Sequence, residues 1–100
     1  MVQHVFSVYD EKAEAFYPPF FLQTVGMALR EIMDCVNDPK HKFGAHPADY
    51  TLFQLGVFDD STGVLVADKK SLGCCIEFKT QSELPLDNVI PLFNEEETDS

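Results

Sequence analysis

The run TLFQLGVFDDSTG at residues 51–63 constrains the fold of this chain more than any other feature. Apolar residues fall on both alternating sides of TLFQLGVF, whereas a strand with one wet face would alternate apolar and polar residues. We therefore expect a central strand with cover on both faces. The polar turn that follows ends in Gly63, and VLVA then resumes a strand, so we predict a β-hairpin with a bulged loop.

A change of hydrophobic period predicts one amphipathic helix over residues 24–37. Its apolar positions recur at steps of three and four residues: Val25, Ala28, Leu29, Ile32, Met33 and Val36. Thr24 is the expected N-cap, and Asn37-Asp38-Pro39 should end the helix. The opening VQHVFSVYD alternates with period two, which indicates a first strand.

The segments between these elements are expected to be irregular. Residues 10–21 contain Pro18 and Pro19, so we predict a connection that carries an aromatic plug: Phe16, Tyr17, Phe20 and Phe21. Residues 38–49 read as a loop anchored by Phe43. For residues 71–79 a strand is favoured, with a short helix capped by Ser71 as the alternative.

These elements predict an α+β fold: an antiparallel sheet of three or four strands with the helix packed on one face. Residues 1–80 should form a single domain, and residues 81–100, which carry six acidic residues and no basic one, a mostly flexible acidic tail. A lone helix covers one sheet face. The face that it leaves uncovered is therefore the expected interface of a homodimer.

The sequence contains no clear catalytic, metal or cofactor motif. Glycine-rich phosphate-binding loops are absent, and the three cysteines and three histidines lack the paired spacing of a zinc site or the order of a known nucleophile and base. We expect a protein that is not an enzyme, with no cofactor and no bound metal. No apolar stretch approaches the length of a membrane span, so we expect a soluble intracellular protein without a membrane partner.

The formal net charge of −10 opposes nucleic-acid binding, which draws on Lys and Arg. Weak single-stranded DNA binding is still an alternative, because basic and aromatic residues cluster locally. The candidate contacts with nucleic acid or a partner are Lys40, Lys42, Phe43, His46, Lys69, Lys70 and Lys79. An apolar island in the tail could dock on a partner protein through Val89, Ile90, Leu92 and Phe93.

Three ordered motifs carry a resemblance to a known family. They are SVYDEKAEAFYPPFF, then VNDPKHKFGAHPADYTLFQLGVFDDSTG, then SLGCCIEFKT. Together they resemble the small nonstructural protein of gokushoviruses, single-stranded DNA phages of the Microviridae, whose members show a HPxDYTLFxxGxFDxxTG core after a helix that ends in VNDP. The resemblance spans residues 4–80 and departs at Cys74-Cys75, where small or apolar residues are expected.

The resemblance implies a biological role but no chemical mechanism. Such proteins are not part of the virion, and they have been likened to the small microvirus protein that turns genome synthesis toward single strands and packaging. It therefore implies a nonenzymatic phage accessory protein in the host bacterial cytoplasm, which acts in genome replication or packaging through phage or host protein partners. The resemblance transfers no catalytic or DNA-contacting residue.

Overall fold

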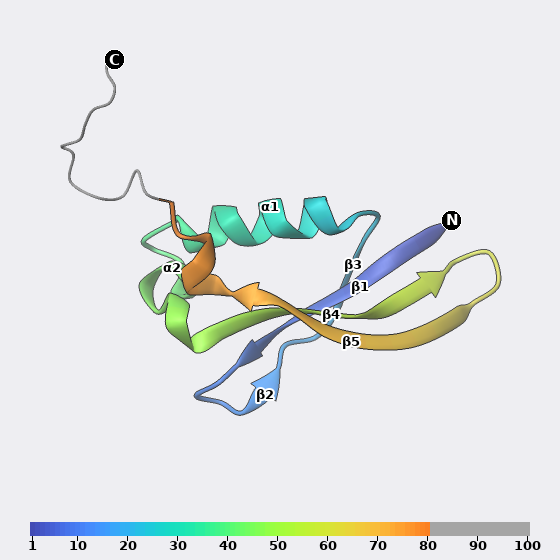
Figure 1. Ribbon diagram of the computed structural model, residues 1–100, viewed down its shortest axis with the longest axis horizontal. Helices are drawn as coiled ribbons and strands as arrows, with labels where there is room; N and C mark the ends of the chain where they lie inside the picture. Colours follow the sequence, from blue (N-terminus) through green and yellow to red (C-terminus); the bar gives the residue numbers. More distant parts are fainter. Residues whose placement is uncertain (81–100) are drawn as a thin grey trace, which may run out of the picture.

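The computed structural model describes residues 1–80 and shows an α+β fold, an antiparallel sheet with one main helix lying along one of its faces (Figure 1). The strands are β1 (Val2–Asp10), β2 (Ala15–Phe16), β3 (Phe20–Leu22), β4 (Tyr50–Asp59) and β5 (Val64–Cys74). The helices are α1 (Val25–Val36) and the short α2 (Lys42–Ala45). The predicted fold class is confirmed, and the expected tail at 81–100 lies outside the described residues.

Strand β4 is central, as its two apolar sides predicted. It pairs with β1 on one edge and with β5 on the other. The β4–β5 turn closes through the Gly63 amide, which donates to the Asp59 carbonyl at 2.7 Å, and Gly63 has a φ of 77°. The hairpin is thus the one predicted, with the positive φ on the residue type that tolerates it best.

The sheet has five strands because the predicted connection at 10–21 is partly paired. Strand β2 pairs with Tyr9 and Asp10 of β1, and β3 pairs with His4 to Phe6. The tandem Pro18-Pro19 lies between these two short strands. Proline has no amide hydrogen to donate to a ladder, so a single edge strand is divided in two at this point.

Helix α1 begins where the sequence predicted. The Thr24 hydroxyl accepts a hydrogen bond from the Met27 amide at 3.1 Å, and Asn37 is the C-cap. The helix buries Ala28, Ile32 and Val36 against the sheet. Their partners in the core are Phe6, Val8, Phe43, Tyr50, Leu52 and Cys75. One face of the sheet is therefore covered by α1 and by the segment that follows it.

Residues 38–49, predicted as a loop, contain α2 and a 3₁₀ turn at Pro47–Asp49. His41 caps α2, because its Nδ1 accepts from the Phe43 amide at 3.1 Å. Histidine is not among the usual N-cap residues, so no sequence pattern predicted this helix. The expected anchor is present, since Phe43 is only 6% exposed and packs on Tyr17 and Tyr50.

The ambiguous segment 71–79 is a strand as far as Cys74 and a 3₁₀ turn over Cys75–Phe78. The favoured strand is present but stops early, at Cys74. The alternative, a short helix capped by Ser71, was wrong in its start and its cap, because the turn starts four residues after Ser71 and no side chain caps it. The turn fully buries Cys75. It also brings Lys79 back to the helix, where its ammonium donates to the carbonyls of Val36 at 3.4 Å and Gly44 at 3.2 Å.

Replacing Gly44 with alanine should destabilise the fold. A Cβ at this position would collide with the Asp38 carbonyl oxygen and lie 2.9 Å from the Val36 carbonyl oxygen. Forcing an extra methyl into packed backbone costs about 1–3 kcal/mol, and urea unfolding should show a loss of that size. Gly26→Ala is the matched control. It meets nothing closer than Thr24 Oγ1 at 3.9 Å and should raise the free energy of unfolding by up to about 1 kcal/mol.

Lys79→Met tests whether Lys79 holds the end of α1. The methionine keeps most of the apolar stem but cannot donate to the two carbonyls, so the free energy of unfolding should fall by about 1 kcal/mol or more. Lys40 is exposed, and Lys40→Met should change stability by less than about 0.5 kcal/mol. Equal thermal midpoints for the two variants would show that Lys79 is only a surface charge.

Candidate functional site

The sheet face turned away from α1 is the candidate functional site. In β1, Phe6 and Val8 point toward the helix, so the alternating Val5, Ser7 and Tyr9 lie on the opposite face. Directly opposed residues of neighbouring strands share a face. Phe21 opposes Val5, and Phe53 opposes Ser7. The second face of the sheet therefore carries aromatic side chains, although no helix within residues 1–80 covers it (Figure 1).

Five rings on this side, Tyr9, Phe16, Phe21, Phe53 and Phe58, are called the aromatic face below. They form two groups. In the first, the ring centroids of Tyr9 and Phe16 are 4.9 Å apart, and those of Phe16 and Phe53 are 5.2 Å apart, edge to face. In the second, the Phe21 and Phe58 centroids are 5.8 Å apart. Phe16 is 39% exposed and Phe21 is 45% exposed, so solvent still reaches both groups.

Lys69 of β5 lies over the first group. Its ammonium is 5.6 Å from the centroid of Phe16 and 5.9 Å from that of Phe53, within the range of a cation–π contact. The sequence singled out Lys69 as a candidate contact but placed Phe16 in a connecting plug. The only sequence signal for this group of rings was the second apolar side of the central strand. Of the rings in the group, that side contains only Phe53.

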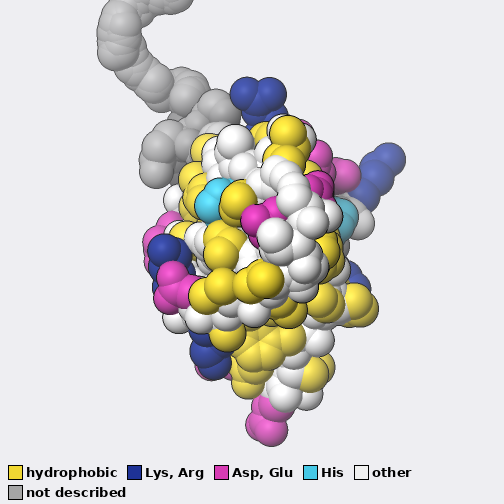
Figure 2. Space-filling view, turned by 90° about the vertical axis from the view of Figure 1, so that its right-hand side faces the viewer, with side chains coloured by type: hydrophobic (Ala, Val, Ile, Leu, Met, Phe, Trp, Pro, Cys, Tyr) yellow, Lys and Arg dark blue, Asp and Glu magenta, His cyan; other side chains and the backbone are white. Residues whose placement is uncertain are grey.

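The strand positions around the aromatic face hold no acidic residue, and the Asp60 carboxylate meets this surface only at the turn end, where it accepts a hydrogen bond from Gln3 at 3.3 Å. The residues that the strand ladders place on this side of β1, β4 and β5 are Gln3, Val5, Ser7, Tyr9, Thr51, Phe53, Gly56, Phe58, Leu65, Ala67, Ser71 and Cys74. None of these paired residues is acidic, although the chain has seventeen acidic residues. In Figure 2, hydrophobic side chains gather over the lower part of the view, the side away from α1. The face is thus apolar with one nearby positive charge.

The seven candidate contacts do not form one site. Five are at least partly free on the surface: Lys40, Lys42, His46, Lys69 and Lys70. Phe43 is buried, which corrects its selection as a contact, because an anchoring ring in the core cannot also meet a partner. Lys79 is engaged by two backbone carbonyls. Its position after the mostly apolar segment SLGCCIEF did not indicate this role.

The exposed bases divide between two places. Lys42 lies over the Tyr17 ring at 4.6 Å, and a hydrogen bond with the Tyr17 hydroxyl raises its pKa. It belongs to α2, which Figure 1 shows at the end of the molecule opposite the β4–β5 turn. Lys69 and Lys70 lie midway along β5, where Lys70 pairs with Asp68 at 3.9 Å. These residues therefore do not form a continuous basic surface.

The cysteines and histidines have structural surroundings. Burial raises the pKa of the Cys75 thiol to about 12, and burial with nearby Glu31 raises the pKa of Cys35. A thiol nucleophile works as its thiolate, so both positions oppose that chemistry. His4 shares a 3.0 Å hydrogen bond with the Gln54 amide, and His41 caps α2.

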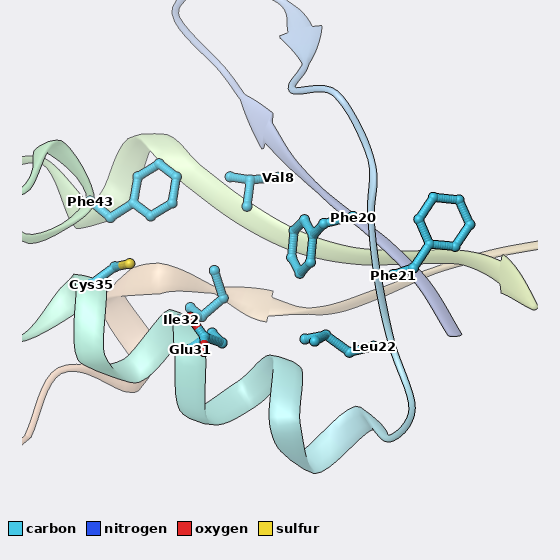
Figure 3. Close-up of a pocket in the computed structure, with 8 residues that line it drawn as sticks. All are labelled: Val8, Phe20, Phe21, Leu22, Glu31, Ile32, Cys35 and Phe43. Atoms are coloured by element: carbon cyan, nitrogen blue, oxygen red, sulfur yellow. The ribbon is translucent and has the colours of Figure 1, made fainter. Parts of the chain in front are cut away.

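An apolar groove opens between α1 and the β1–β3 pair, with a volume of about 470 Å³ (Figure 3). Val8, Phe20, Ile32 and Phe43 face its interior, whereas the ring of Phe21 points away from it. Glu31 is its one charged lining residue. Ligand sites usually combine an apolar wall with several convergent polar groups, and this groove lacks them.

Within residues 1–80, no three His, Cys, Asp or Glu side chains are arranged to hold a metal ion. No helix in the same part of the chain is long and apolar enough to span a membrane. The predicted docking residues Val89, Ile90, Leu92 and Phe93 lie outside the described residues.

Comparison with known proteins identifies the family. The model of the phage ORF5 protein family matches residues 3–78, which include the strands and helices of the described part of the chain except Val2 at the start of β1. No curated protein and no solved structure matches the chain. Because the family model spans most of the chain, the protein belongs to the phage ORF5 protein family.

Proposed function

We propose that this chain is a nonenzymatic accessory protein of a gokushovirus-type single-stranded DNA phage, which acts in genome replication or packaging by contacting proteins through its aromatic face. Membership of a phage ORF5 family supports the phage setting. The resemblance of its ordered motifs to the small gokushovirus nonstructural protein supports the narrower part of the proposal. Under this proposal the protein acts in the host bacterial cytoplasm and is not part of the virion.

The observation that carries the proposal is an exposed aromatic sheet face without acidic residues. Phe16 and Phe21 keep 39% and 45% of their surface in solvent, and Leu65, which opposes Phe58, keeps 64%. Contiguous apolar patches on small proteins mark interaction sites, and interface centres are rich in aromatic residues and poor in charge. A protein partner would bury these rings, and the long Lys69 side chain can extend its ammonium from over the rings to the edge of the contact, where it keeps its hydration.

Replacement of Phe21 in the phage should reduce the amount of single-stranded genome. Phe21→Ser removes an exposed ring from the aromatic face, so the partner contact should weaken while double-stranded replicative DNA still accumulates. The two DNA forms in infected cells are measured by strand-specific hybridisation. Met27→Ser is the control, because Met27 has the same 45% exposure but lies on α1.

Normal yields of single-stranded genome from a phage that lacks this protein would overturn the proposal. Thermal unfolding of both purified variants is measured first. This comparison ensures that a loss of viral DNA reflects the surface change rather than loss of the fold.

A second candidate function is weak binding of single-stranded DNA. Lys69 beside the rings of Phe16 and Phe53 supports it, since bases stack on aromatic side chains while cations meet phosphates. The net charge of −10 and the division of the other lysines between two regions count against it. A protein partner is therefore the leading interpretation.

Fluorescence anisotropy with an oligothymidylate separates the two candidates. A DNA-binding face predicts association at low salt that weakens steeply as salt rises, is reduced by Lys69→Gln and persists without residues 81–100. Lys40→Gln provides the charge-matched control in the other basic region. Absence of binding at low salt would eliminate the DNA reading and leave the protein-contact proposal intact.

A further inference from the structure

We propose that the aromatic face binds the same face of a second copy of this chain, so that two sheets pack together in a two-fold symmetric homodimer. The inference rests on the proposed function, in which this face contacts protein, and it names the partner. Three observations support it: the charge of the face, the apolar character of β4 and the arrangement of small and large residues across the strands.

Charge favours this surface over the rest of the chain. Each copy carries a net charge of −10, and residues 1–80 alone hold eleven acidic against seven basic residues. Two copies therefore repel each other over most orientations. The paired residues of the aromatic face include no carboxylate, and Lys69 lies beside them. Contact through this face brings the two copies together where their repulsion is weakest.

The central strand provides the apolar surface. Leu52 on the α1 side is fully buried, but Phe53 and Phe58 on the other side are only partly covered. At the turn end of the hairpin, Leu65 opposes Phe58 and extends the apolar surface onto β5. Packing of two such faces would remove these side chains from water, at roughly 25 cal/mol for each Å² of apolar surface. Face-to-face sheets are a common way to bury them.

The arrangement of small and large side chains on the aromatic face is suited to contact with the same face of a second copy. One row of opposed residues crosses the three long strands with small side chains only: Val5, Gly56 and Ala67. The first aromatic group lies toward one end of the strands from this row, and Phe58 with Leu65 lies toward the other. A two-fold axis midway between this row and the first aromatic group would place that group of each copy over the small row of the other, the reciprocal contact that an isologous interface requires.

The experiment is sedimentation equilibrium of the full chain, with two variants at neighbouring positions of β5. Leu65→Glu places a carboxylate on the aromatic face. Val66→Glu places the same charge one residue further, on the opposite side of the strand, because Val66 opposes Val57 rather than Phe58. Both positions are exposed, at 64% and 51%, so neither change should unfold the chain.

We expect the wild type to sediment at twice the monomer mass of 11.3 kDa at micromolar concentration. Leu65→Glu should raise the dimer dissociation constant roughly tenfold or more, because a two-fold contact buries the new charge twice. Val66→Glu should leave the constant within about threefold of the wild type. Added salt should tighten the wild-type dimer by screening the repulsion between copies, the reverse of its effect on DNA binding.

A monomeric wild type at micromolar concentration would overturn the inference, as would equal weakening by the two glutamate variants. Neither result would decide the proposed function. If the protein is monomeric and Phe21→Ser still reduces single-stranded genome, the aromatic face binds a different protein. If it is dimeric and phage without the protein make normal single-stranded genome, the interface is real and the proposed function is wrong.

Discussion

The pairing of β4 between β1 and β5 is the constraint on which the rest of this structure depends. This strand is hydrogen-bonded along both edges and carries apolar residues on both faces, and each face can be buried only by another element or by a partner. Helix α1 covers one side through Ala28, Ile32 and Val36. Gly56 lets β5 approach β4, because a Cβ there would collide with the Val66 carbonyl. The second side remains with its aromatic rings partly in water.

Local patterns were sufficient to predict the elements that carry this pairing. The period of three and four residues with a Thr24 cap located α1, and the alternation of TLFQLGVF with the Asp59–Gly63 turn located the hairpin. They failed where structure depends on partners distant in sequence. The short strands β2 and β3 exist because β1 offers them an edge, and α2 depends on a histidine cap and on packing of Phe43.

The candidate site was harder to predict for the same reason. Lysines can be found by inspection, but whether a lysine is free depends on what the fold places beside it. The Lys79 ammonium donates hydrogen bonds to the carbonyls of Val36 and Gly44. The Lys69 ammonium lies over two aromatic rings instead. The cluster joins residues 9, 16, 53 and 69, and strand register alone brings these together. The turn sets the register within the β4–β5 hairpin, but the pairing of β1 with β4 joins segments far apart in the sequence, and local spacing does not show it.

The distribution of charge supports a role for the second sheet face in contacts with protein. In a chain with ten more acidic than basic residues, a random surface of this size would carry carboxylates, and the side of α1 that faces solvent does carry Glu31 and Asp34. The residues that the ladders pair on the aromatic face are not acidic, and the acids Asp59 and Asp60 lie at the hairpin turn. Acids at the turn keep the hairpin end soluble, while their absence between the rings leaves one surface on which a second protein can dock without burying an unpaired charge.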